Sequence, residues 1–513
     1  MMINSKRLRI VTALLLLLVI SCRSSDADEQ VIKGGVAAIK IDFNGAEYED
    51  NPSVKKLDAQ KKIVLVDPST LLEIEMTTNT TATRTSISES LKDQSKIRII
   101  AYDKASGNYK THKDYFLSGG LLQVIGGGNP ALMLDGGISY TIVTYSFGTK
   151  ELPVLTNGEQ TNINTAKINY NYASVQDFMY EIQNITPVGG ENNILKILLK
   201  HKVAEITTKL RTTPYADIPI EKITKASLSP HYTMGTISLL NGSIINNGTL
   251  SAVTVPFNDP ASPIRIASPV LVNANANGTG EFKADITIDG VTKTINTGPV
   301  FSITPGIRKN LNISIAIKCG AYLGPNQTQW NDFMCHNLGA DTSINPFIPN
   351  AAIHGARYQW GAQTNETGRY YSQSDDQVSN NAVTGWNSTP KADNSWLDAS
   401  KTSNDPCPEG YKVPSADQWQ KVIAYNKITY LGSNWSPNHY DNAVKYGDGL
   451  LLPTAGYRSA FTSVLYDRGL LGYYWSSTEL TSPNSFYLFF APNGAKLLNG
   501  SRNGGYSLRC IKE

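Results

Sequence analysis

Residues 405–419 read DPCPEGYKVPSADQW, and this stretch decides how the C-terminal part of the chain is interpreted. Cys407 stands between two prolines, so by residue type it could be a nucleophile, a metal ligand or a disulfide partner. Ser415 and Gln418 have the spacing of a capping box, in which each side chain satisfies a backbone N–H of the other residue. The spacing predicts a helix start at Ser415, with Trp419 on the buried face of that helix.

The first 22 residues are typical of an exported lipoprotein. MMINSKRLRI is basic, and the apolar run VTALLLLLVI is shorter than the roughly 20 residues that span a membrane. Val19 to Cys22, VISC, resembles a lipobox, which implies a signal peptide over 1–22 and a palmitate-type lipid on Cys22. RSSDADE, which follows, resembles the acidic tag of lipoproteins displayed on the outer membrane of Bacteroidetes. An ordinary signal peptide with a chance cysteine is the alternative.

The charge of the chain outside this leader is balanced. Three of the 46 basic residues lie in the leader, which leaves 43, the same as the number of acidic residues. The chain outside the leader is therefore neutral overall, and nothing in its overall charge argues for nucleic acid as a partner, so none is expected.

Four cysteines remain after Cys22, namely Cys319, Cys335, Cys407 and Cys510. An exported chain meets an oxidising compartment, and an even set of four allows three pairings. There is no C-x-x-C, and a histidine directly beside Cys335 suits a tetrahedral metal site poorly. Two disulfides are therefore expected.

Alternating apolar residues predict strands along most of the first 318 residues. The expected strands include 62–67, 71–76, 96–103 and two strands around the Gly-Gly turn within 131–148. Residues 175–182 fit a short helix or a strand, and 194–210 a strand pair or one long bent strand. An Asp-Gly pair within 286–295 predicts a β-hairpin. Strands at this spacing are typical of β-sandwiches.

The composition changes near Gly320. All seven tryptophans and 15 of the 26 tyrosines follow that residue, which predicts a domain boundary there.

The first two blocks resemble the fimbrillin family, the pilin-like lipoproteins of Bacteroidetes. The matching stretches are TATRTS (81–86), IRIIAYD (97–103), LDGGISYTIVTYS (134–146) and ILKILLKHKVAEITTKL (194–210). The resemblance implies two transthyretin-like β-sandwich domains, over 23–158 and 159–318. It also implies assembly by strand exchange, in which a protease cuts after an arginine and a neighbouring subunit fills the groove that an N-terminal strand leaves. Arg84 and Arg98 are the candidate processing sites.

The last block resembles the Fibrobacter succinogenes major paralogous domain, which has a C-type-lectin-like fold. Besides 405–419, the matching stretches are FMCHNLGAD (333–341), RYQWG (357–361), LLPTAGYR (451–458), YYWSSTE (473–479) and GYSLRC (505–510). The resemblance implies an α+β domain over 319–513 in which Cys407 pairs with Cys510, and Cys319 and Cys335 are left for each other. The whole chain is thus expected to be mainly β.

No catalytic constellation is apparent. The six histidines are scattered singly, and no nucleophile elbow or spaced carboxylate pair occurs, so we expect no enzyme and no cofactor. Asp375 and Asp376 are candidate calcium ligands, because adjacent loop carboxylates suit a hard cation, although a solvated turn is the alternative.

Three tryptophans are candidate ligand-binding residues. Trp386, Trp396 and Trp435 lie in segments rich in Asn, Ser and Pro that read as surface loops. Their flat rings could stack on sugars, or each could fill a small local core instead.

Together these features predict a fimbrial subunit at the cell outer membrane, a pilus tip adhesin that presents a lectin-like domain to a glycan or protein on host or bacterial surfaces. A folded C-terminal domain in place of a free donor strand suits a terminal subunit, whose partners would be other fimbrillin-type subunits. A glycan-binding lipoprotein that captures nutrients and never polymerises is the alternative.

Overall fold

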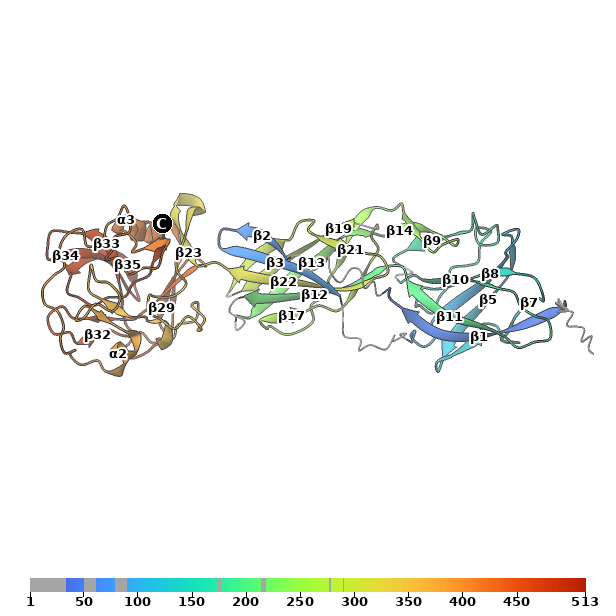
Figure 1. Ribbon diagram of the computed structural model, residues 1–513, viewed down its shortest axis with the longest axis horizontal. Coiled ribbons are helices and arrows are strands. Elements are labelled where there is room, and N and C mark those ends of the chain that lie inside the picture. The colour runs from blue at the N-terminus through green and yellow to red at the C-terminus, as the bar shows by residue number, and fades with distance from the viewer. Residues whose placement is uncertain are drawn as a thin grey trace, which may run out of the picture. The chain divides into compact units, whose positions relative to one another are not determined.

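The computed structural model describes residues 34–49, 61–78, 90–173, 177–213, 218–275, 278–288 and 290–513 (Figure 1). The chain divides into two compact units, and both are assembled from separate stretches of sequence. Unit 1 takes Met1–Tyr48, Thr85–Lys202 and Met234–Asn247, and unit 2 takes Glu49–Arg84, Val203–Thr233 and Gly248–Glu513. No helix within the described ranges has the length and apolar character needed to cross a membrane.

Unit 1 is built on an eight-stranded sheet in the order β6-β5-β4-β8-β10-β11-β1-β7. Its strands are β1 (Val36–Glu47), β4 (Lys96–Asp103), β5 (Tyr109–Ser118), β6 (Leu121–Val124), β7 (Leu132–Asp135), β8 (Tyr140–Ser146), β10 (Met179–Ile185) and β11 (Asn193–His201). A second, three-stranded sheet contains β9 (Lys167–Asn171), β14 (Met234–Ser238) and β15 (Ile244–Asn246). Inward side chains of β1, β4, β8 and β11 form the core, as alternation along each strand requires.

Unit 2 begins with two further sheets. One has the order β17-β12-β22-β3-β2, with β18 also on β12, and the other the order β16-β13-β19-β20, with β21 on β19. The first contains β2 (Lys62–Asp67), β3 (Thr70–Thr78), β12 (Ala204–Thr213), β17 (Ile264–Ile266), β18 (Val270–Val272) and β22 (Arg308–Ile317). The second contains β13 (Ile220–Tyr232), β16 (Leu250–Thr254), β19 (Gly278–Ile288), β20 (Val291–Asn296) and β21 (Phe301–Ile303).

The rest of unit 2 is the segment 319–513, which we call the head. It contains one three-turn helix and many short strands. The elements of its first half are β23 (Gly320–Gly324), η2 (Pro325–Gln327), β24 (Thr328–Asp332), η3 (Ala351–Ile353), β25 (Arg357–Tyr358), β26 (Tyr370–Tyr371), α2 (Gln373–Val378) and β27 (Tyr411–Lys412). Those that follow are α3 (Ala416–Tyr425), β28 (Ile428–Leu431), β29 (Ala443–Tyr446), β30 (Leu450–Pro453), β31 (Tyr457–Arg458), β32 (Leu465–Tyr466), β33 (Gly472–Glu479), β34 (Asn484–Ala491), β35 (Gly494–Ser501) and β36 (Ile511–Lys512).

The predicted boundary at 158/159 is wrong as a unit boundary. Both 158 and 159 lie inside unit 1, which continues to Lys202. The strands β2 and β3 come early in the chain, yet they belong to unit 2, because β3 pairs along nine residues with β22. Local alternation finds strands, but it carries no information on which distant strand completes a ladder.

Pairing also differs from expectation at two predicted turns. The stretch 194–210 forms two strands, β11 and β12, but they belong to different units and do not pair with each other. The strands around the Gly-Gly turn, β7 and β8, are not neighbours either, since β7 pairs with β1, whereas β8 pairs with β4 and β10. The Asp-Gly hairpin is confirmed, with Ile288 opposite Val291 in the β19–β20 ladder. Within 175–182, residues 179–182 belong to the strand β10, and no helix forms in the described part.

The helix predicted within 405–419 is confirmed as α3. The Ser415 side chain accepts a hydrogen bond from the Gln418 backbone N–H (3.1 Å), and the Ser415 backbone N–H donates to the Gln418 side chain (2.9 Å). Trp419 is wholly buried, and its Nε1 donates to the backbone oxygen of Trp475 on β33. The capping box therefore fixes where α3 starts and which face it turns to the core.

Two disulfides join distant parts of the head. Cys319 pairs with Cys335 and Cys407 pairs with Cys510, with Cα–Cα distances of 5.0 and 5.9 Å. The two bonds close stretches of very different length, 16 and 103 residues.

Because of this difference, replacing both Cys407 and Cys510 by alanine is expected to destabilise the head by about 4–5 kcal/mol on the chain-entropy model, against about 3 kcal/mol for Cys319 and Cys335. Denaturant unfolding of the full chain followed by tryptophan fluorescence measures this, since all seven tryptophans lie in the head. The expectation would be contradicted if the variant without Cys319 and Cys335 lost as much unfolding free energy as the variant without Cys407 and Cys510, or more.

Candidate functional site

The N-terminal strand β1 lies inside the large sheet of unit 1, beside β11 and β7 (Figure 1). It runs parallel to β11, from Ile39 opposite Asn193 to Glu47 opposite Lys200, with a bulge between Phe43 and Ala46. It runs antiparallel to β7, which pairs with no other strand among the described residues. Removing β1 would therefore leave two ladders without a partner.

Side chains of β1 also complete the core. Ala37 and Ile39 are buried, Ile41 and Phe43 pack partly against the same cluster, and Lys40 between them is exposed. An extended segment that alternates in this way offers two things at once, backbone pairing and apolar side chains. Loss of β1 would therefore remove both backbone partners and core side chains from unit 1.

Arg98, one of the two processing candidates, is a structural residue in β4. It is 4% exposed, and its guanidinium group makes two hydrogen bonds of 2.8 Å to the carboxylate of Asp114. A third bond of 3.0 Å joins it to Glu159, which is wholly buried. The prediction of Arg98 as a processing site is wrong for the folded chain, because a protease needs an accessible, extended backbone. Arg84, like Cys22, lies outside the described residues.

The three candidate tryptophans lie in different environments. Trp396 is wholly buried against Trp360, with ring centroids 5.5 Å apart, so its prediction as a ligand-binding residue is wrong. Trp435 is half-buried and packs against the core next to Tyr430. Trp386 is half-buried and stacks on Tyr371, with ring centroids 5.3 Å apart.

The indole N–H groups of all three candidates already have acceptors in the chain. Trp386, Trp396 and Trp435 donate to the backbone oxygens of Asn503, Asn404 and Gly432 respectively, at 3.0 to 3.3 Å. What Trp386 and Trp435 still offer a ligand is therefore ring surface rather than a hydrogen bond.

The two calcium candidates have unrelated structural roles. Asp375 is exposed at the start of α2, where its carboxylate accepts a hydrogen bond of 2.7 Å from the Ser372 hydroxyl. Asp376 is 1% exposed and faces three guanidinium groups, those of Arg357, Arg458 and Arg468. The calcium prediction for Asp376 is wrong, because a carboxylate surrounded by three cations does not attract a fourth. No cluster of three potential metal-ligating side chains occurs among the described residues.

The charge of Asp376 is stabilised by these arginines. Arg357 Nε lies 3.0 Å and Arg458 Nε 2.6 Å from its two carboxylate oxygens, and Arg468 bonds to it as well. Burial alone would raise the pKa of Asp376, but the three guanidinium groups outweigh burial and lower this pKa below its ordinary value. The carboxylate stays ionised in the folded head.

Arg458 extends the cluster to two surface loops. Its Nη1 donates to the backbone oxygens of Asn381 and Ser463 (2.9 Å each), and its Nη2 donates to that of Ser379 (2.8 Å). The loop after α2 and the loop after β31 are thus held by one buried guanidinium group, whose charge Asp376 balances.

A histidine beside the cluster does not add to its charge. His354 is wholly buried, and burial together with the charges of Arg357 and Arg468 lowers its pKa to about 3. The imidazole is therefore neutral at physiological pH and contacts Tyr440, with ring centroids 5.5 Å apart.

Sequence reasoning missed the arginine cluster. Arg357 and Arg458 stand in the quoted stretches RYQWG and LLPTAGYR, where an arginine directly beside buried aromatic and aliphatic residues is the available signal. The three arginines are up to 111 positions apart in sequence, so only the fold shows that they share one carboxylate.

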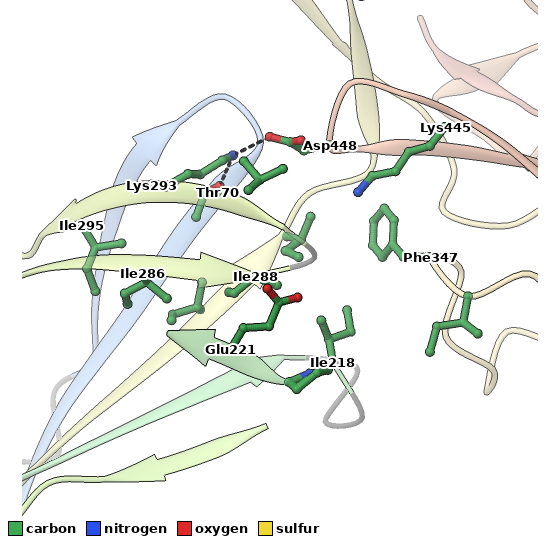
Figure 2. A pocket seen from close by; sticks show the side chains of 15 residues that line it. Thr70, Ile218, Glu221, Ile286, Ile288, Lys293, Ile295, Phe347, Lys445 and Asp448 are labelled. Carbon is green, nitrogen blue, oxygen red and sulfur yellow. Dashed lines mark hydrogen bonds and ion pairs between the residues drawn. The ribbon is translucent and has the colours of Figure 1, made fainter. Parts of the chain in front are cut away.

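Unit 2 also contains an apolar cavity of about 260 Å³ (Figure 2). Aliphatic side chains of β19, β20 and β22 form most of its wall, and Phe347 of the head also lines it. At its edge, Lys293 bonds to Asp448 (3.2 Å) and to the Thr70 hydroxyl (2.9 Å). With the described lining the cavity has room for an apolar group.

The chain was compared with known proteins, and the solved structures that it matches have limited similarity to it. No protein-family model matches the chain, and no curated protein matches it. Among solved structures, a protein assigned to cell adhesion from Bacteroides fragilis NCTC 9343 shares 15% identity over 55% of this chain and 93% of its own, with a TM-score of 0.33. A protein assigned to cell adhesion from Bacteroides ovatus ATCC 8483 has 14% sequence identity to this chain. The match covers 55% of this chain and 92% of that protein, with a TM-score of 0.33. A fimbrial assembly protein from Parabacteroides distasonis ATCC 8503 has 14% sequence identity to this chain. The match covers 53% of this chain and 96% of that protein, with a TM-score of 0.30.

Replacing Asp376 by asparagine should destabilise the head by about 3–5 kcal/mol, because three buried guanidinium groups lose the one carboxylate that pairs them. The folded-state pKa of Asp376 is lowered, so the contribution is complete above the ordinary pKa of about 3.9 and is lost as the pH falls through the folded-state pKa. The difference in unfolding free energy between wild type and variant should shrink in that acid range.

Denaturant unfolding followed by tryptophan fluorescence at several pH values measures this difference. Asp375→Asn is the matched control, since it changes the neighbouring, exposed carboxylate and should cost no more than about 1 kcal/mol. Similar losses for the two variants at neutral pH would contradict the assigned role of Asp376.

Proposed function

We propose that the chain is a surface-displayed lipoprotein of a fimbrial system, a terminal subunit that accepts a strand in unit 1 and uses the head for adhesion. The observation that carries the proposal is the position of β1, the first of the described strands, between β11 and β7 in the large sheet. Its loss would leave unpaired backbone and apolar pockets that a strand from another subunit could fill.

The end of the second sandwich supports a terminal position. Its last strand, β22, lies between β12 and β3 and is thus an interior strand. Only Lys318 separates it from Cys319, which is bonded to Cys335 in the head. A strand held on both sides and tied at its end to a disulfide is not free to be donated, so the subunit is proposed to accept a strand and not to supply β22. The proposal assigns no catalytic activity to the chain.

Strand acceptance can be tested with a variant that lacks Val36–Glu47. We expect this variant to bind a synthetic peptide of sequence VAAIKIDFNGAE and to regain thermal stability in unit 1 with it. A peptide with Ile39→Asp should bind at least tenfold more weakly, because Ile39 is wholly buried, whereas Lys40→Ala should bind normally, because Lys40 is exposed. Binding is measured by calorimetry.

Partners from the native cell surface test the assembly itself. A tagged chain should co-purify with pilus subunits, and loss of those subunits should remove it from fimbriae. Co-purification with a glycan-uptake complex alone, together with failure to bind the strand peptide, would favour the nutrient-capture alternative instead.

Lipid anchoring makes a separate prediction. Cells fed an alkyne analogue of palmitate should label the chain, and Cys22→Ala should abolish both the label and outer-membrane association, because the thiol that carries the lipid is gone. Labelling that persists in the variant would show that another residue is acylated.

A further inference from the structure

The head exposes two large apolar side chains, one on the last residue of α2 and one on the loop after β31. Phe461 is 93% exposed and Val378 84% exposed, the highest values for large apolar residues in the described part of the chain. Tyr466, further along the second loop, is 45% exposed. Apolar groups this exposed cost solubility, and where several gather on one surface they mark an interaction site.

The two loops form one surface because they are bonded to each other. We define the loop-pair surface as residues 377–386 and 459–466. The Leu465 N–H donates to the Asn380 oxygen (2.8 Å), and the Val383 N–H donates to the Ser463 hydroxyl (2.8 Å). The buried Arg458 side chain donates hydrogen bonds to backbone oxygens in both loops. Val378 and Phe461 therefore belong to two segments that are hydrogen-bonded to each other and to Arg458.

This bracing lowers the entropic cost of binding. Arg458 is 1% exposed and is paired with Asp376. Backbone oxygens of the two loops are therefore hydrogen-bonded to a buried ion cluster. Phe461 itself lies in a turn. The backbone N–H groups of Phe461 and Thr462 both donate to the Ser459 hydroxyl oxygen, at 3.3 Å each. A loop ordered before binding loses less conformational freedom when a ligand arrives.

The chemistry of the loop-pair surface selects the kind of ligand. Its sequences, QVSNNAVTGW and SAFTSVLY, contain no charged residue. The exposed polar side chains are amides and hydroxyls, from Asn380, Asn381, Thr384 and Thr462. Anionic partners such as acidic lipids, sulfated glycans or nucleic acid gain nothing here, because their recognition depends on exposed basic groups.

We propose that the loop-pair surface binds an uncharged saccharide chain. A sugar ring presents a flat C–H face that can lie on the ring of Phe461 and beside Val378, while its hydroxyls pair with the neighbouring amide and hydroxyl groups. Neither partner has to bury a charge, so the desolvation cost is that of neutral polar groups alone. This inference rests on the proposed adhesive function and names its binding face and ligand class.

The test is an array of neutral oligosaccharides of hexoses and N-acetylhexosamines, with sialylated and sulfated oligosaccharides on the same slide, probed with the full chain. Wild type should bind at least one neutral structure, and Phe461→Ala and Val378→Ser should each weaken that binding at least tenfold. Tyr425→Ala is the matched control, because Tyr425 is an exposed aromatic of the head on α3 (37%), outside the loop-pair surface. Unchanged tryptophan-fluorescence unfolding shows that each variant is folded.

Three results would overturn the inference: binding only to charged oligosaccharides, neutral binding that both variants retain, or no binding to the array. Adhesion of whole cells separates these failures from failure of the proposed function. If cells that display the chain adhere, and Phe461→Ala removes adhesion without any glycan signal, the ligand is a protein and the saccharide assignment is wrong. If displaying cells do not adhere to any surface, the adhesive function itself fails.

Discussion

The ion cluster around Asp376 is the constraint on which the head depends. One buried carboxylate faces three guanidinium groups, so the cluster carries more positive than negative charge inside the protein. Several other N–H groups of these arginines donate to backbone oxygens, for example Arg458 Nη2 to Ser379 and Arg357 Nη1 to Gly456. Charge-assisted bonds of this kind are stronger than neutral ones, which lets them organise long connections that lack strand ladders.

The sandwich sheets are held in a different way. There the backbone groups satisfy one another along ladders, and side chains alternate between a core and solvent. A ladder specifies its partner by pattern rather than by individual residues, so the proposed exchange at β1 requires a strand of similar alternation and no matched set of charges. The head has no such freedom, because losing Asp376 leaves three buried guanidinium groups without their carboxylate. This contrast explains why exchange is proposed for unit 1 and recognition for the head.

What the sequence predicted well was local. The capping box at Ser415 and Gln418 requires only four consecutive residues, and the Asp-Gly hairpin requires only ten. Strand positions followed from alternation along the chain.

What the sequence could not predict depended on contacts far apart along the chain. The membership of β2 and β3 in unit 2 follows from pairing between β3 and β22, more than 200 residues away. Trp396 lies in a segment as polar as that of Trp386, yet the fold buries one and half-exposes the other. Asp376 looked like a calcium ligand because its neighbour Asp375 was visible in the sequence and its three arginine partners were not.

The same cluster accounts for the neutral character of the loop-pair surface. Arg458 is the charged residue that directly precedes the second loop, and its guanidinium group points inward to Asp376 and to the oxygens of Ser379 and Asn381. The charge is thus used to hold the loops and is not displayed on them. A surface built in this way is rigid without being charged, so selectivity among ligands has to come from the shape of its apolar groups and from the placement of its amides and hydroxyls, and should depend little on salt.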